Sequence, residues 1–196
     1  MVATHDATLK RVGLPTMRTL VARIVDTFDQ AMPSDVEAGA AWYVEARELA
    51  LSFANNGVDV ERAACVISHL SPRTSWTRNV EGAVALLAYG ERGNGIIGAN
   101  FERAVSALAA EDPWSTFGPT APKTLNFARN IAGDDEAVTV DVWAARVVGC
   151  DESTLSRVGI YDAIAHAYRL AARRRGVSPA TMQATTWIVA RGGRAD

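Results

Sequence analysis

Apolar residues recur along most of this chain at the spacing of an α-helix, and this periodicity constrains the fold more than any other feature. The clearest stripe follows an i, i+3, i+4, i+7 pattern, and its members are Val60, Ala63, Ala64, Ile67 and Leu70. Similar stripes run through residues 80–87 and 160–171. Only the short run 137–140 resembles an extended segment, and it leads straight into another helical pattern. The sequence therefore predicts an all-α fold.

Helix start and stop signals agree with this periodicity. Ser34 and Glu37 have the spacing of a capping box, and Ser178 followed by Pro179 is typical of an N-cap and a first helical position. Glycines follow several of the periodic segments, where they are suited to end a helix. The sequence predicts about ten short helices, over residues 17–31, 36–55, 60–70, 77–89, 98–110, 121–132, 142–149, 154–158, 160–175 and 179–190.

The composition is that of a globular chain, with 48% hydrophobic and 21% charged residues and a net charge of −2. No uninterrupted apolar run is long enough to cross a bilayer, and the first residues lack the apolar core of a signal peptide. We therefore expect a cytoplasmic protein with no membrane partner. Its two cysteines, Cys65 and Cys150, are too few for a disulfide scaffold or a four-cysteine zinc or iron–sulfur site. No other motif indicates a metal or a cofactor, so we expect none.

Two ionisable residues are the best candidates for chemistry. Lys123 is one of only two lysines among 20 basic residues, and a lysine amine can act as a nucleophile where an arginine guanidinium cannot. Asp141 follows an apolar triplet and precedes a helical pattern, which places its carboxylate at a helix N-terminus. The alternative roles are structural, because an aspartate commonly caps a helix and a lysine in a first turn is commonly just exposed.

Three short motifs lie in a recognisable order. Ser71-Pro72-Arg73-Thr74 forms a turn between two predicted helices, Lys123-Thr124 opens a later helix, and Val140-Asp141 opens another. In order and spacing these motifs resemble those of the helix-hairpin-helix base-excision DNA glycosylases, the endonuclease III superfamily. The resemblance covers residues 60–149, about half of the chain.

The resemblance implies two helical lobes around a cleft, one formed by residues 1–55 and 136–196 and the other by residues 56–135. It implies that Asp141 stabilises the positive charge that builds on the sugar as a base departs. It also implies that Lys123, across the cleft, attacks the sugar carbon in members that cleave the strand. Because a base inside a duplex must be flipped out to be reached, the resemblance implies that Arg73 fills the vacated space or contacts the orphan base. A salt bridge within the loop is the alternative role for Arg73.

Further candidates for DNA contact follow from their motifs or their residue types. Thr74 and Thr124 belong to the matched motifs, and Arg173 and Arg174 lie in a run of cations that would contact phosphates or stabilise a helix end, together with Arg191 and Arg194. The ring faces on which an extruded base could stack are those of Trp42, Tyr43 and Trp143, for which core packing is the alternative role.

The chain departs from the family pattern at the hairpin. Members usually carry two glycines there whose N–H groups approach a phosphate, whereas this chain has Pro119-Thr120-Ala121-Pro122, and proline has no N–H to donate. The C-terminal cysteine cluster of many relatives is also missing, which agrees with the expected absence of an iron–sulfur cluster.

The favoured function is cleavage of the N-glycosidic bond of a damaged or modified base in DNA, with strand cleavage through Lys123 as a candidate second step. One alternative keeps the fold and changes the substrate to hypermodified bases of viral DNA or to nucleosides. The other alternative is a helical DNA-binding protein without catalytic activity, in which Asp141 only caps a helix.

Overall fold

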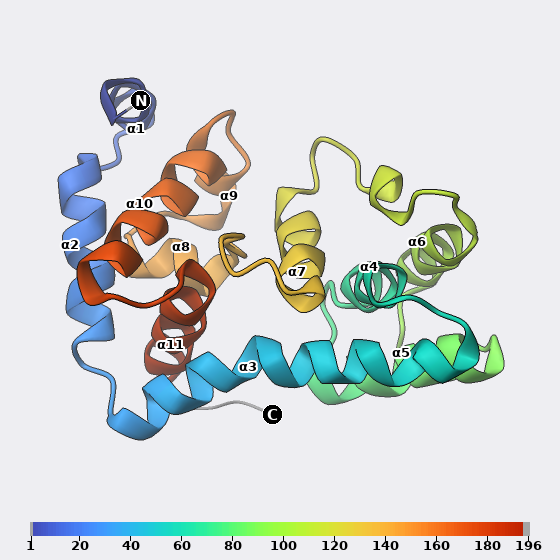
Figure 1. Ribbon diagram of the computed structural model, residues 1–196. Helices are drawn as coiled ribbons and strands as arrows, with labels where there is room; N and C mark the ends of the chain where they lie inside the picture. Colours follow the sequence, from blue (N-terminus) through green and yellow to red (C-terminus); the bar gives the residue numbers. More distant parts are fainter. Residues whose placement is uncertain (1, 194–196) are drawn as a thin grey trace. The chain divides into compact units, whose positions relative to one another are not determined.

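The computed structural model describes residues 2–193, and the regular elements in this range are all helices, which confirms the predicted all-α class (Figure 1). Two short 3-10 helices are η1 (Phe53–Asn56) and η2 (Pro113–Thr116). The α-helices are α1 (Val2–Arg11), α2 (Met17–Phe28), α3 (Pro33–Ser52), α4 (Val60–Leu70), α5 (Trp76–Tyr89), α6 (Gly98–Ala109), α7 (Pro122–Ala132), α8 (Val142–Val147), α9 (Glu152–Leu155), α10 (Ile160–Arg175) and α11 (Pro179–Arg191).

The predicted helices are present with modest changes at their ends, and α4 and α10 have the predicted bounds. The sequence analysis missed α1, because this helix carries no apolar stripe. Of residues 5–11 only Leu9 is buried. Tertiary contacts hold α1 instead, since it packs against α2 and α10 and its Asp6 carboxylate accepts a hydrogen bond of 2.6 Å from the Met17 N–H. The helix expected over 154–158 lies earlier, at Glu152–Leu155.

The chain divides into two compact units. Within the described residues, the first unit combines residues 2–42 with residues 135–193, and the second unit is Tyr43–Asp134. The first boundary between the two units, after Trp42, therefore falls inside α3. The lobe boundary expected from the sequence lies near residue 55, at η1. Each unit has a separate hydrophobic core.

The core of the first unit forms around α10, which contacts α1, α2, α9 and α11 (Figure 1). The side chains of Ile160, Ile164 and Tyr168 on this helix are fully buried. Helix α11 contacts α2 and α8 as well as α10. Helices α8 and α11 are therefore in direct contact, and this pairing is the basis of the candidate site described below.

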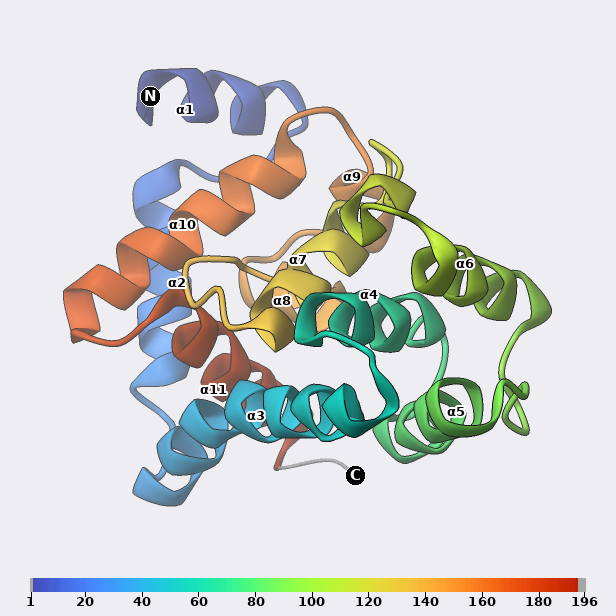
Figure 2. The same cartoon turned by 45° about the vertical axis from the view of Figure 1, so that its right-hand side comes forward.

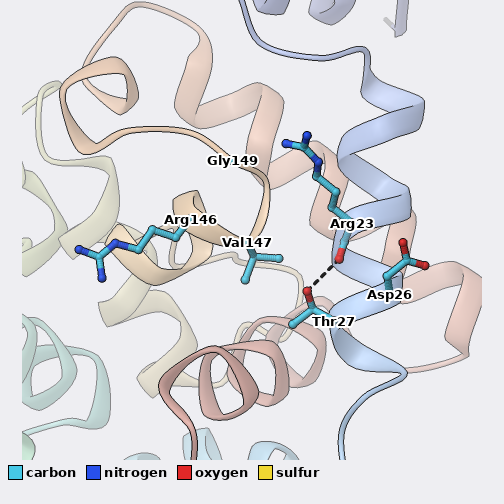
Figure 3. A pocket seen from close by; sticks show the side chains of 6 residues that line it. All are labelled: Arg23, Asp26, Thr27, Arg146, Val147 and Gly149. Carbon is cyan, nitrogen blue, oxygen red and sulfur yellow. Dashed lines mark hydrogen bonds between the residues drawn. The ribbon is translucent and has the colours of Figure 1, made fainter.

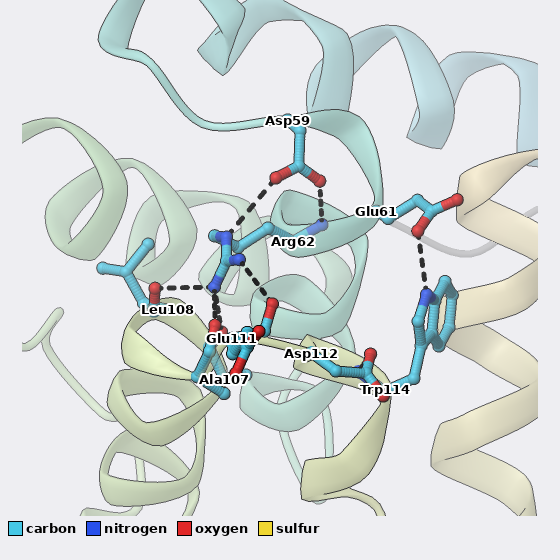
Figure 4. Close-up of polar contacts among 9 residues, drawn as sticks. Asp59, Glu61, Arg62, Ala107, Leu108, Glu111, Asp112 and Trp114 are labelled. Carbon is cyan, nitrogen blue, oxygen red and sulfur yellow. Dashed lines mark hydrogen bonds and ion pairs between the residues drawn. The ribbon is translucent and has the colours of Figure 1, made fainter.

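Helix α4 is central to the second unit, where it contacts α5, α6 and α7 (Figure 2), and every residue from Ala63 to Leu70 is buried. Arg62, in the first turn of α4, also caps the C-terminus of α6. The Arg62 guanidinium donates to three carbonyls there, at 3.0, 2.9 and 2.6 Å, those of Ala107, Leu108 and Ala110 (Figure 4). Carbonyls at a helix C-terminus lack partners within the helix, so Arg62 supplies the missing donors.

Two helices of the first unit approach closely at Gly39, which is buried in the interior of α3. A Cβ at this position would overlap the Thr185 Oγ1 of α11 and would lie 2.8 Å from the Thr185 backbone nitrogen. Glycine disfavours a helix by about 1 kcal/mol relative to alanine, and the contact with Thr185 explains why glycine is needed there.

Within residues 2–193, none of the helices combines the length and the hydropathy needed to cross a bilayer.

Candidate functional site

Asp141 lies at the N-terminus of α8, as the sequence predicts, and its carboxylate is held by three donors. One carboxylate oxygen accepts hydrogen bonds from the backbone N–H groups of Trp143 (2.9 Å) and Ala144 (2.8 Å). The other accepts one from the indole Nε1 of Trp187 on α11 (3.1 Å). The residue is half-buried, so a fixed carboxylate faces partly toward solvent.

A buried tyrosine positions the segment that leads to Asp141. Residues 137–140 are buried and form no regular element. The Tyr161 hydroxyl donates to the Val138 carbonyl (2.8 Å) and accepts from the Val140 N–H (3.1 Å). This pair of bonds satisfies backbone groups that burial would otherwise leave without water or a partner, and it fixes where α8 begins.

Three tryptophans and two arginines form a continuous set of ring contacts that reaches this carboxylate through Trp143 and Trp187. The Arg146 guanidinium lies 4.7 Å from the centre of the Trp143 ring. The Arg191 guanidinium lies 5.9 Å from the same ring and 4.4 Å from the Trp187 ring. The Trp42 ring packs against Trp187 with the ring centres 5.4 Å apart. These five residues, all in the first unit, are called the Trp–Arg cluster below.

The electrostatics of the Trp–Arg cluster are dominated by its two cations. The three tryptophans are half-buried, whereas Arg146 and Arg191 are exposed. In the part of the chain that the structure describes, neither guanidinium has a carboxylate within ion-pair distance. Among the described residues both guanidinium groups lie over tryptophan rings, whose faces attract cations.

Sequence reasoning identified Trp42 and Trp143 and named Arg191 as a candidate phosphate contact, but it missed Trp187, Arg146 and the contacts of both arginines with the tryptophan rings. A signal was available, because Trp143 and Arg146 are three residues apart and Trp187 and Arg191 are four apart. Side chains at these spacings are neighbours on a helix surface. No local pattern joins Trp187 to Asp141, which precedes it by 46 residues.

Lys123 and Thr124 lie in the first turn of α7, in the second unit. Lys123 is exposed. The Thr124 hydroxyl donates to the Ala121 carbonyl (3.1 Å), and the Thr124 carbonyl accepts from the Ser68 hydroxyl on α4 (2.6 Å). Thr124 therefore fixes the start of α7, and Lys123 does not share a compact unit with Asp141.

The backbone of Arg73 is in the left-handed region, with a φ of 61°. Within residues 2–193 it is the one residue other than glycine with a positive φ. Its side chain is exposed at the turn between α4 and α5. The turn is held by the Thr74 N–H, which donates to the Ser71 carbonyl (3.1 Å), and by the Asn100 side-chain amide, which donates to the Pro72 carbonyl (3.0 Å). Such conformations cost about 1–3 kcal/mol and persist where the surroundings impose them, often at functional sites.

The remaining predicted residues lie elsewhere. Tyr43 is buried in the second unit, with its ring edge-on to Phe127 at 6.3 Å, so it does not belong to the Trp–Arg cluster. Arg173 donates to the Arg169 carbonyl one turn back (3.3 Å), and Arg174 is exposed in the last turn of α10. Arg194 lies outside the described residues.

An open hollow of about 480 Å³ in the first unit is lined by Arg23, Asp26, Thr27, Arg146, Val147 and Gly149 (Figure 3). The Arg23 guanidinium is committed to structure, since it donates to the Val148 carbonyl at 2.6 Å. The Arg146 side chain points away from Arg23, out of the hollow. The two arginines of the lining therefore do not converge on the hollow.

The thiols are placed for packing. Cys65 and Cys150 are free and buried, and burial raises the pKa of both, that of Cys65 to about 12. Because the thiolate is the reactive and metal-binding form, neither side chain is primed as a nucleophile. Among the residues that the structure describes, no three His, Cys, Asp or Glu side chains are grouped to hold a metal.

Comparison with known proteins identifies one family. Its description is "Family of unknown function (DUF7178)", and it matches residues 7–194, so the chain belongs to this family. No curated protein matches the chain, and no solved structure matches it.

Proposed function

We propose that this member of the DUF7178 family binds DNA and cleaves the N-glycosidic bond of a damaged or modified base, with Asp141 as the catalytic carboxylate. The observation that carries the proposal is the fixed, half-buried Asp141 carboxylate bordered by the Trp–Arg cluster. The motif resemblance supports the same residue.

The reaction places positive charge on the sugar. The bond between the sugar C1′ and the base nitrogen breaks, and the electron pair leaves with the base. Water then adds its oxygen to C1′, one of its protons is lost to solvent, and the base takes up a proton. A carboxylate held in place before the reaction stabilises such a cation without reorganisation, and partial exclusion of water strengthens the effect.

The hydrogen bonds of Asp141 are compatible with this role. A carboxylate has about four acceptor positions, and the three donors to Asp141 occupy both positions on one oxygen and a single position on the other. The oxygen that faces Trp187 therefore keeps one acceptor position, with which it can orient the attacking water.

Arg73 is the proposed wedge that fills the space left by the flipped base. Its strained backbone and its exposed side chain support this role. Lys123 is the candidate nucleophile for strand cleavage, a step that would require its exposed amine to become neutral at the sugar.

The test is mass spectrometry of free bases released from a pool of normal, damaged and hypermodified duplex DNA. We expect Asp141→Asn to lower the rate of release by at least about a hundredfold, because an amide still accepts hydrogen bonds from the two backbone N–H groups but carries no charge. Borohydride added to the same reactions would trap an imine if Lys123 attacks, and the adduct would be lost in Lys123→Arg.

The matched control is Asp112→Asn. Asp112 also starts a helix, where its carboxylate accepts from the Trp114 N–H (3.0 Å), and it lies in the second unit. We expect this variant to release the base at the wild-type rate. Equal release by wild-type protein and Asp141→Asn would reject the proposed catalytic role.

One observation favours a second candidate function. The three hydrogen bonds of Asp141 also constitute a complete helix cap linked to α11, which is sufficient to explain the residue in a DNA-binding protein without catalytic activity. DNA binding without base release from any member of the pool would favour this candidate.

A further inference from the structure

The Trp–Arg cluster holds two cations in place without neutralising them. Arg146 and Arg191 both lie over the Trp143 ring, and Arg191 also lies over Trp187. Elsewhere in the first unit the exposed Arg175 pairs with the Asp29 carboxylate, which lowers the pKa of Asp29. Arg146 and Arg191 have no such partner among the described residues.

A guanidinium stacked on an aromatic ring retains its capacity for hydrogen bonding. Its five N–H donors lie in its own plane and point outward from the stack, in a fork that matches two oxygens of a phosphate. The ring contact restricts the side chain before any ligand arrives, so less conformational entropy is lost on binding. Both side chains are exposed, so a ligand can reach these donors.

The tryptophan rings of the cluster already contact other side chains of the protein. Trp143 carries two guanidinium groups, and Trp187 carries Arg191 together with the Trp42 ring at 5.4 Å. A nucleobase that stacks on these rings would compete with these partners. These contacts favour a role for Trp143 as a support for arginine side chains over the base-stacking role that the sequence suggested.

We infer that Arg146 and Arg191, held on Trp143 and Trp187, bind the phosphates of a DNA backbone next to the Asp141 carboxylate. The inference rests on the proposed function, and it assigns the Trp–Arg cluster to the backbone instead of the base. The chain as a whole has a net charge of −2, so a local pair of unneutralised cations is needed to attract a polyanion.

The experiment measures binding of a fluorescent duplex oligonucleotide by anisotropy at several salt concentrations. Each phosphate contact contributes about 0.9 to the slope of log K against log salt. We expect Arg146→Gln and Arg191→Gln each to weaken binding about tenfold at low salt, and the double variant to lower the slope by about 1.8. The control Arg18→Gln removes an exposed arginine of the same unit that lies over no aromatic ring among the described residues. We expect the slope of this variant to stay within about 0.3 of the wild-type slope.

A second pair of variants tests the rings as positioning residues. Trp143→Phe keeps an aromatic face under the two guanidinium groups, whereas Trp143→Leu removes it. We expect the phenylalanine variant to retain most of the affinity and the leucine variant to lose several-fold, with circular dichroism confirming that both are folded. Equal affinities in these two variants would contradict the positioning role.

The outcomes separate this inference from the proposed function. A lower slope in the double variant supports the phosphate site whether or not any base is released. An unchanged slope, or no oligonucleotide binding by wild-type protein, overturns the phosphate site, while the Asp141→Asn assay on base release is scored separately. A deoxynucleoside monophosphate is titrated in parallel, and Arg-dependent binding of this probe without binding of the oligonucleotide would also overturn the backbone assignment.

Discussion

At Asp141, one set of contacts serves both local structure and the proposed chemistry. The two backbone donors belong to the start of α8, and the third donor comes from α11. Replacing the carboxylate by an amide retains the first pair and removes the charge, although the amide NH2 group cannot accept the hydrogen bond from the Trp187 indole. The two capping bonds of α8 are therefore kept while the charge is lost, which is why Asp141→Asn separates capping from catalysis. Asp141→Ala would remove the capping hydrogen bonds and the charge together, so it would not distinguish capping from catalysis.

A buried histidine makes stability depend on pH. The His69 ring stacks on Phe117 at 4.2 Å, and its Nε2 lies 2.9 Å from the Thr116 hydroxyl. Burial, with a smaller effect of Arg103, lowers the pKa of His69 from 6.5 to about 4. Between these two values the unfolded chain binds a proton that the folded chain excludes, so the free energy of unfolding falls as the pH decreases from 6.5 to 4 and is recovered above 6.5.

We expect this histidine to contribute about 2–3 kcal/mol to the loss of stability between pH 7 and pH 4.5. Urea unfolding at both pH values measures the change, and His69→Gln is the comparison because glutamine does not titrate. The variant is expected to be less stable at pH 7 and to lose less on acidification. Parallel pH profiles for the two proteins would contradict this assignment.

Arg73 provides a test of strain against function. Arg73→Gly removes the cost of a positive φ, about 1–3 kcal/mol, and adds chain entropy to the unfolded state, about 0.5–1 kcal/mol. We expect a net gain of about 1 kcal/mol in the free energy of unfolding, together with slower base release because the wedge is lost. The control Arg92→Gly, at an exposed loop arginine without a positive φ, should be destabilising by about 0.5 kcal/mol.

At the scale of elements, helix contacts override helix propensity at one position in α3. Glycine to alanine in a helix interior is ordinarily stabilising by about 1 kcal/mol. At Gly39 the added Cβ would meet backbone atoms of Thr185 at 2.8 and 2.9 Å, which a side-chain rotation cannot relieve. Overpacking of this kind costs about 1–3 kcal/mol.

We therefore expect Gly39→Ala to lower the free energy of unfolding by about 2 kcal/mol. Thermal or urea unfolding measures the change. The matched control is Ala40→Gly, next to it on the exposed face of α3, which should cost only the propensity difference of about 1 kcal/mol. A stabilised Gly39→Ala variant would mean that α3 and α11 can separate without cost.

Helices were predictable wherever burial follows a stripe. Helix α4 begins at Val60 and ends at Leu70, the first and last residues of its apolar stripe, although its burial extends beyond the stripe to every residue from Ala63 to Leu70. Helix α1 buries only Leu9 among residues 5–11 and depends on contacts with α2 and α10. Such a helix leaves no periodic signal in the sequence, because tertiary packing and not its own pattern stabilises it.

At the scale of the whole molecule, the candidate site could be predicted only in part. Asp141 was found because an apolar run followed by an aspartate and a helical pattern is a local signal. Its partner Trp187 was not found, because only the fold brings α8 and α11 together. Tyr43 and Trp42 are adjacent in sequence and were grouped together, yet the division between the units falls between them.

The order of the units along the chain has a consequence for synthesis. A ribosome completes the second unit, Tyr43–Asp134, while α8, α10 and α11 of the first unit are still unmade. Asp141 would then emerge without its indole donor, which follows 46 residues later. The carboxylate acquires its third hydrogen bond only when α11 has left the exit tunnel, so a stalled or prematurely terminated chain that lacks α11 would contain every residue of the second unit but an unfinished candidate site.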